Sequence, residues 1–171
     1  LRFPADDVRL ARAVRENEFV LHFQPQFALA DGALVGVEAL IRWQHPEQGL
    51  VPPDAFIPLA EERRLILPIG RWVLAEALRC AVRWHATGLA PVPVAVNVST
   101  LEFQSPGFVE AVERALADSG AAGPMLELEL TERMLIDDIE HAPTTPTALA
   151  TNTATRPSFA CVIGRFTSRW T

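Results

Sequence analysis

The chain has 171 residues, of which 49% are hydrophobic and 21% charged, a composition typical of a globular protein and not of a disordered one. Its formal net charge of −6 gives no support for a surface that binds a nucleic acid polymer. No apolar run approaches the roughly 20 residues of a membrane span, and the first residues lack a signal-peptide pattern. Because its two cysteines are far apart and suggest no disulfide framework, we expect a cytoplasmic protein. A start at Leu1 instead of Met suggests a fragment of a longer product.

The beginning of the chain predicts a helix followed by a β-hairpin. Residues 5–17 place apolar side chains on one face of a helix. Residues 19–28 alternate between apolar and polar, and a turn at Asp31-Gly32 leads directly into 33–43. A connection this short predicts that the two strands pair antiparallel.

The following segments predict alternating helices and strands. The expected helices are 55–62, 68–86, one opened by Ser105-Pro106 with proline at its first helical position, and 132–140; the expected strands are 92–98 and 125–130. This order after the hairpin implies a parallel sheet with right-handed crossovers, and therefore an α/β fold.

Three oxygen-bearing side chains interrupt the apolar strand runs, namely Glu38, Asn97 and Glu129. Burying such a group without a partner costs several kcal/mol. A hard divalent cation is one suitable partner, because Mg²⁺ and Mn²⁺ prefer oxygen ligands. Since parallel strands end at the same edge of a sheet, these side chains could meet there in a metal site.

Each of these residues also has a simpler structural interpretation. Glu38 could pair with Arg42, four residues further on. Asn97 could be a strand-end residue bonded to its neighbours' backbone, and Glu129 could be the solvent-facing member of an alternating strand.

The sequence surrounding these residues carries a resemblance. The stretch EALIRWQHPEQGLVPPDAFIPLAEE at 38–62 closely resembles the EAL family of cyclic-di-GMP phosphodiesterases, and NVS at 97–99 and ELTE at 129–132 follow in that family's order. The similarity runs from about Leu10 to Ile139. It implies an EAL-type (β/α)₈ TIM barrel with an antiparallel first strand. A whole barrel needs about 250 residues, so we expect only part of one, with the C-terminal strands missing.

The resemblance implies a reaction and a metal site. The family hydrolyses cyclic-di-GMP to linear pGpG, with two metal ions roughly 4 Å apart that activate water and stabilise charge on the phosphate. Glu38, Asn97 and Glu129 would be three of the ligands of Mg²⁺ or Mn²⁺.

The resemblance also implies substrate contacts. Arg42 would grip a phosphate through its planar guanidinium, Gln24 would contact the guanine edge, and Leu40 would line the substrate site. Glu132 matches a family glutamate that supports an active-site loop. Alternatively, Gln24 is an ordinary edge-strand amide, and Glu132 is a carboxylate at the start of a helix.

The sequence changes character after Glu140. All 21 acidic residues lie at or before this position, whereas the last 31 residues contain only arginines among their charged side chains. We therefore expect three parts: a helix at 1–18 leading into the domain, a truncated EAL domain at 19–140, and an unrelated, disordered tail at 141–171.

The catalytic set implied by the family is incomplete in this sequence. The chain has no lysine and no DDFGTGYSSL-like string, and Asp137-Asp138 follows Glu129 too soon to be the paired aspartates. We expect a protein that has cyclic-di-GMP as its ligand, no appreciable turnover alone, and possible self-association through an open barrel edge. The alternatives are a catalytically dead module that binds a nucleotide or a protein, and a frame-shifted gene fragment.

Overall fold

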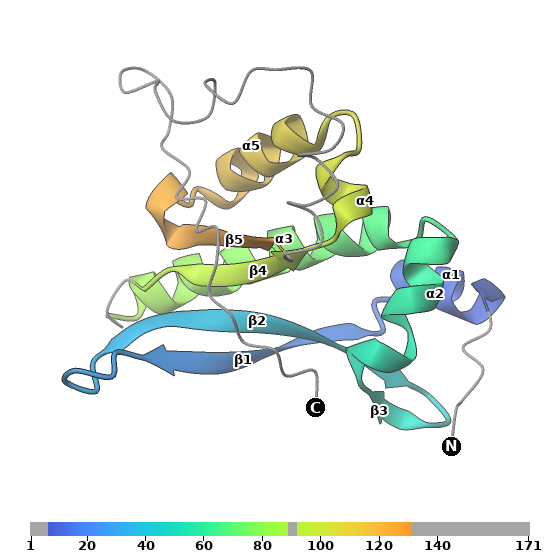
Figure 1. Ribbon diagram of the computed structural model, residues 1–171, viewed down its shortest axis with the longest axis horizontal. Coiled ribbons are helices and arrows are strands. Elements are labelled where there is room, and N and C mark those ends of the chain that lie inside the picture. Colours follow the sequence, from blue (N-terminus) through green and yellow to red (C-terminus); the bar gives the residue numbers. More distant parts are fainter. Residues whose placement is uncertain (1–6, 89–91, 131–171) are drawn as a thin grey trace, which may run out of the picture.

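A computed structural model of the protein describes residues 7–88 and 92–130 (Figure 1). The predictions for Glu132, the helix at 132–140 and the tail at 141–171 lie outside these residues. The elements in chain order are α1 (Asp7–Arg15), β1 (Phe19–Phe27), β2 (Leu34–His45), β3 (Gly49–Val51), the 3₁₀ helix η1 (Pro53–Ala55), α2 (Ile57–Glu62), α3 (Ile66–Ala86), β4 (Val94–Val98), α4 (Thr100–Phe103), α5 (Phe108–Ser119), the 3₁₀ helix η2 (Gly123–Met125) and β5 (Leu126–Leu130).

The five described strands form one sheet in the order β1-β2-β4-β5, with β3 paired to β2. β1 and β2 are antiparallel, and their turn is stabilised by Asp31, whose Oδ1 accepts from the backbone N–H of Ala33 at 3.0 Å. β4 runs parallel to β2, and β5 runs parallel to β4. The predicted hairpin and the predicted parallel pairs are therefore confirmed.

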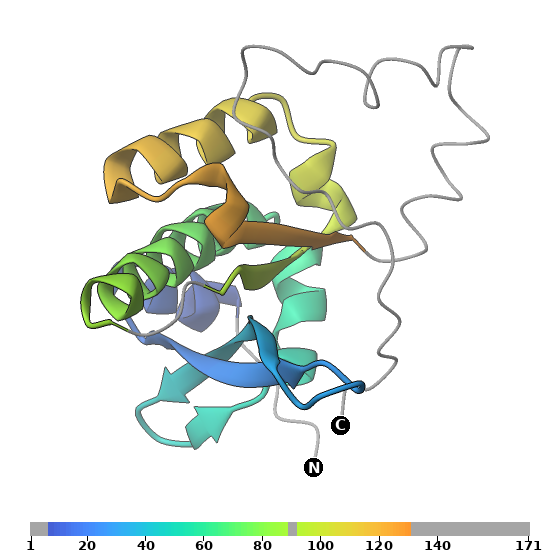
Figure 2. The ribbon, with the colours of Figure 1, turned by 90° about the vertical axis from the view of Figure 1, so that its left-hand side faces the viewer.

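Helices α3 and α5 lie on the same side of the sheet (Figure 2). Apolar residues of α3 pack against odd-numbered side chains of β1 and β2, which point to one face because strand side chains alternate, and α5 packs against α3. The ring of Trp72 lies 6.0 Å from that of Phe19, and the ring of Trp84 lies 4.6 Å from that of Phe23. This helix-covered face contains the core of the described residues.

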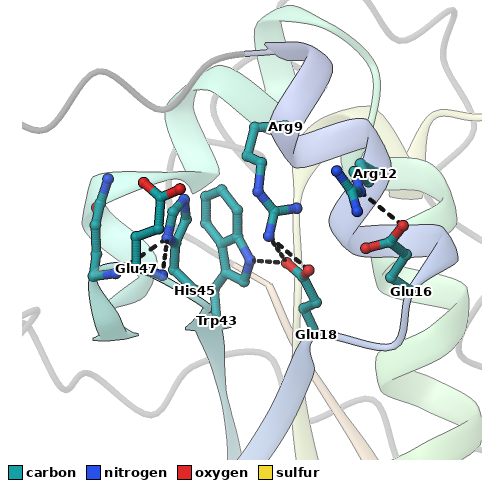
Figure 3. Close-up of polar contacts among 8 residues, drawn as sticks. Arg9, Arg12, Glu16, Glu18, Trp43, His45 and Glu47 are labelled. Atoms are coloured by element: carbon teal, nitrogen blue, oxygen red, sulfur yellow. Dashed lines mark hydrogen bonds and ion pairs between the residues drawn. The ribbon is translucent and has the colours of Figure 1, made fainter.

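A polar cluster fastens α1 to the hairpin (Figure 3). One Nη of Arg9 donates to both carboxylate oxygens of Glu18, at 2.6 and 2.7 Å. The indole N–H of Trp43 donates to the same carboxylate at 3.0 Å. The Arg9 guanidinium beside Glu18 holds the pKa of that carboxyl below its usual range, so Glu18 is ionised at neutral pH.

The structure corrects two details of the predicted helices. Pro106 is not in the first turn of a helix. Gly107 is the N-cap of α5, and its left-handed conformation, with φ 81°, separates Pro106 from the helix. The expected helix at 55–62 is divided at the fully buried Phe56, with a 3₁₀ turn before it and α2 after it. The short elements β3 and α4 were not predicted.

Candidate functional site

The even-numbered residues of β1 and β2 and the odd-numbered residues of β4 and β5 share the sheet face opposite to α3 and α5. The pairings fix this arrangement, because Gln24 lies opposite Glu38, Glu38 beside Ala95, and Asn97 beside Glu129. We call this the site face. Its polar and charged members are His22, Gln24, Gln26, Glu38, Arg42, Gln44, Asn97, Glu127 and Glu129.

Glu38 and Asn97 are joined across the sheet. The side-chain Nδ2 of Asn97 donates to Oε1 of Glu38 at 2.8 Å, and both side chains are half-buried. A metal ion takes an amide through its oxygen, and this hydrogen bond leaves Oδ1 of Asn97 available for that purpose. The two residues are 59 positions apart in the sequence and are brought together by the parallel pairing of β2 with β4.

Glu129 lies beside Asn97 on the next strand. The two residues are register partners in the β4–β5 pair, and neighbouring strands are about 4.8 Å apart. Each is the penultimate residue of its strand, so both belong to the carboxyl ends of β4 and β5. Glu38, Asn97 and Glu129 are thus brought together on one face.

Arg42 lies on the same face, four residues after Glu38, and is half-buried. Its Nη1 donates to the backbone carbonyl of Ile41 at 2.8 Å. Within residues 7–88 and 92–130, no ion pair joins Arg42 to Glu38. The simpler interpretation of Glu38 as the partner of Arg42 is therefore not what the structure shows.

The two remaining predicted substrate contacts also lie on the site face. Gln24 is exposed and lies opposite Glu38 in the antiparallel pair. Leu40 is half-buried and lies opposite the exposed His22. The hairpin therefore presents an amide, an apolar side chain and a guanidinium next to the Glu38–Asn97 pair.

The connection that follows Asn97 is held by a residue that was not predicted as part of the site. Glu102 is only 7% exposed, and its Oε2 accepts from the backbone N–H of Ser99 at 3.0 Å and from the Ser99 hydroxyl at 2.6 Å. Burial raises the pKa of Glu102 above its ordinary value. The signal was present in the sequence, because Ser99 and Glu102 have the spacing of a helix capping box.

The donor chemistry of the site face fits a hard divalent cation. Two carboxylates and one amide oxygen are the ligand types that Mg²⁺ and Mn²⁺ prefer. In the described part of the chain, no group of three or more His, Cys, Asp or Glu side chains is placed to hold a metal ion. Glu38, Asn97 and Glu129 are the residues that would hold one, and further ligands would have to come from outside this group.

The arrangement of the sheet and its helices defines the class of protein. A sheet with an antiparallel first strand, parallel strands after it and helices α3 and α5 on one side is one portion of a (β/α)₈ barrel, and Asn97 and Glu129 lie at the carboxyl ends of its parallel strands. The sequence model of the EAL domain matches residues 7–170. The chain belongs to the EAL domain family.

Named relatives agree with this assignment. The chain is 42% identical over 131 residues to the bifunctional diguanylate cyclase/cyclic di-GMP phosphodiesterase MucR of Pseudomonas aeruginosa, a match that covers 77% of this chain and 19% of the relative. It is also 42% identical over 131 residues to the cyclic di-GMP phosphodiesterase NbdA of the same organism, covering 77% and 17%. The chain thus spans about a fifth or less of the length of these curated relatives.

Solved structures share the fold. The structure of the MucR phosphodiesterase in complex with c-di-GMP aligns with a TM-score of 0.73 at 42% identity, and the match covers 77% of this chain and 53% of that chain. The FimX EAL domain of Xanthomonas citri in complex with c-di-GMP aligns with a TM-score of 0.68 at 27% identity, covering 78% and 52%. The described residues therefore correspond to about half of an EAL-type TIM barrel.

Two further observations bear on the earlier predictions. The family match extends to residue 170, beyond the composition break at Glu140, whereas the aligned relatives cover about three quarters of the chain. The division at 140 remains a prediction. None of the helices within the described ranges is long and apolar enough to cross a membrane.

Proposed function

We propose that this chain is the part of a cyclic-di-GMP phosphodiesterase domain that binds the nucleotide and a divalent cation, Mg²⁺ or Mn²⁺. The observation that carries the proposal is the hydrogen bond between Asn97 and Glu38, with Glu129 beside them at the carboxyl ends of β4 and β5. The family membership and the titles of the relatives support cyclic-di-GMP as the ligand.

Each residue on the site face has a defined part in this proposal. Glu38 and Glu129 supply negative charge, and Asn97 supplies a neutral oxygen while its N–H orients the Glu38 carboxylate. Arg42 pairs with a phosphate of the ligand, because its guanidinium has five N–H donors and only Nη1 donates to the carbonyl of Ile41. Gln24 offers an amide to a guanine edge, and Leu40 packs against the ligand. The bound cation would supply charge stabilisation at the phosphate and lower the pKa of a water bound to it.

Binding without turnover is the expected behaviour of the chain alone. Its 171 residues include no lysine, so the family's active-site lysine has no candidate here, and no paired aspartates follow in the family's pattern. This observation favours the alternative of a binding module over an active phosphodiesterase. In the whole domain, the reaction would be hydrolysis to pGpG.

The proposal includes a location and a self-association. We propose a cytoplasmic protein that binds no nucleic acid polymer, in line with its net charge of −6. Among the described strands, β1 and β5 lie at the two ends of the order β1-β2-β4-β5, and an edge strand can add a strand from another chain. We therefore propose a homo-oligomer that forms through an open edge of the partial barrel.

The test is calorimetric titration of the full chain with cyclic-di-GMP in the presence of Mg²⁺ or Mn²⁺, together with chromatography for pGpG. We expect binding heat that disappears in Glu38→Ala and Asn97→Ala and persists in Glu113→Ala, which removes an exposed carboxylate of α5. No product should form. Binding that is insensitive to Glu38→Ala would refute the site, and metal-dependent product formation abolished by that substitution would refute the binding-only expectation.

A further inference from the structure

We propose that Glu102 is a positioning residue, which fixes the end of β4 and thereby the side chain of Asn97, and that it does so from a niche that Gly70 leaves open in α3. The proposal rests on the proposed function only where it treats Asn97 as a ligand. Its structural part concerns the contact between α3 and α4 and can be tested without any ligand.

The first support is the way in which α4 is attached to β4. Ser99 is the N-cap of this four-residue helix, two residues after Asn97. The Glu102 carboxylate accepts from both the backbone N–H and the hydroxyl of Ser99, and the Ser99 hydroxyl in turn accepts from the Glu102 N–H at 3.3 Å. These three hydrogen bonds hold the backbone where the strand ends and the helix begins.

The second support is the fit between Glu102 and α3. Gly70 is buried in the first half of that helix, and a Cβ atom added there would lie 1.5 Å from Oε1 of Glu102. Glycine is among the poorest helix formers, and Gly70 has no left-handed backbone that would require it. A Cβ atom at residue 70 would force this carboxylate to move, and its hydrogen bonds from Ser99 oppose that movement.

The two supports together give Glu102 a role that reaches the site face. α3 is a 21-residue helix packed on the sheet, so it provides a rigid wall for the carboxylate. The carboxylate holds Ser99, and Ser99 is separated from Asn97 only by Val98, which is 3% exposed and anchored in the core. A displaced Glu102 would therefore release the backbone next to Asn97 and loosen its hydrogen bond to Glu38.

The experiment follows the side-chain amide signal of Asn97 by ¹⁵N nuclear magnetic resonance in the full chain, with Asn97→Ala to assign the signal. We expect Glu102→Ala and Gly70→Ala to shift or broaden this signal, whereas Glu102→Gln preserves it, because an amide oxygen can still accept from Ser99. An unchanged signal in Glu102→Ala and Gly70→Ala, with lowered unfolding midpoints, would overturn the positioning role and leave a merely structural one.

The niche is tested separately by a double-mutant cycle on the unfolding midpoint. Gly70→Ala should lower the midpoint in the wild-type chain but not in the Glu102→Ala background, where the clash is gone. An equal loss in both backgrounds would overturn the niche. If Glu102→Ala does not fold, the unfolding midpoint and the Asn97 amide signal are compared between Gly70→Ala, in which the carboxylate is displaced, and Glu102→Gln, in which the hydrogen-bond acceptor is retained.

A metal titration separates this inference from the proposed function. Residues that orient metal ligands typically contribute about 10–100-fold in affinity, so Mn²⁺ should bind at least about tenfold more weakly to Glu102→Ala and Gly70→Ala than to Glu102→Gln. The proposed function fails if the unmodified chain does not bind Mn²⁺, or if Asn97→Ala binds Mn²⁺ as well as the unmodified chain does. The Asn97 amide signal then still decides whether Glu102 positions this side chain.

Discussion

The two faces of the sheet are built from alternate residues of the same strands, yet they differ in almost every physical property. In β4, Val94, Val96 and Val98 point toward the helices and are at most 3% exposed, whereas Asn97 between them points to the site face and hydrogen-bonds to Glu38. The helix-covered face is held by apolar contact, and the site face by a polar pair.

This difference teaches which substitutions should affect folding and which should affect binding. Shortening a side chain on the helix-covered face removes apolar contacts and leaves a cavity, so it should lower the free energy of unfolding. A half-buried polar residue on the site face contributes little apolar burial, and its cost should appear as lost ligand affinity. Substitutions at neighbouring positions can therefore test whether one face determines stability and the other determines ligand affinity.

The largest loss of stability is expected at Trp43, on the helix-covered face. This side chain is 2% exposed, and its ring lies 6.3 Å from that of Phe19 and 5.9 Å from that of Phe56. Trp43→Ala should lower the free energy of unfolding by about 3–5 kcal/mol, because it removes a large buried ring and leaves a cavity. Urea denaturation measures this loss. A loss below about 1 kcal/mol would show that the end of β2 is not part of the cooperative core.

The sharpest comparison of the two faces is the pair Val96→Ala and Asn97→Ala. Val96 is 1% exposed, and its truncation should cost about 2 kcal/mol of stability while leaving the Glu38 side of the sheet intact. Asn97→Ala should cost about 1 kcal/mol through the lost hydrogen bond, and should abolish the metal-dependent binding of cyclic-di-GMP. Equal losses of affinity in the two variants would mean that the faces are coupled.

Much of this arrangement could be predicted from local pattern. The Asp31-Gly32 turn between alternating runs indicates the antiparallel hairpin, and helical segments between the later strands indicate parallel pairing. The placement of Glu38, Asn97 and Glu129 on one face follows from the same strand pattern. Their roles as ligands came from the family resemblance and remain proposals.

The remaining features depend on contacts between segments that are distant in the sequence, and local sequence pattern does not predict such contacts. The hydrogen bond from Asn97 to Glu38 is set by the register of two strands, and the niche at Gly70 is set by the packing of α3 against α4. A local signal can also mislead. Pro106 favours the start of a helix, but the left-handed conformation of Gly107 delays the start of α5 to Phe108.

The cluster of α1 with the hairpin should make stability sensitive to acid. The pKa of Glu18 is lowered chiefly by its hydrogen bonds from Arg9, so the folded state favours the ionised carboxylate. Its contribution to stability is therefore present above the unfolded-state pKa and is lost as pH falls through the folded-state value. Glu18→Gln should be less stable than the parent at pH 7, with a gap that narrows at acidic pH. Urea midpoints at pH 7 and pH 3 measure this gap, and a constant gap would contradict the ion pair.

Glu102 should show the opposite dependence on pH, with the smallest effect of the four. Burial raises its pKa, and the hydrogen bonds from Ser99 offset this only in part, so the folded state holds the proton more tightly than the unfolded chain. Stability is then lost as pH rises from the unfolded-state pKa through the folded-state value. Because Glu102→Gln cannot ionise, its stability relative to the parent should be greater at pH 7 than at pH 4. Unfolding midpoints of the two proteins at both pH values provide the measurement. A relative stability that moves in the other direction would show that the Ser99 hydrogen bonds outweigh burial, and that Glu102 resembles the cation-paired Glu18 in its preference for the ionised form.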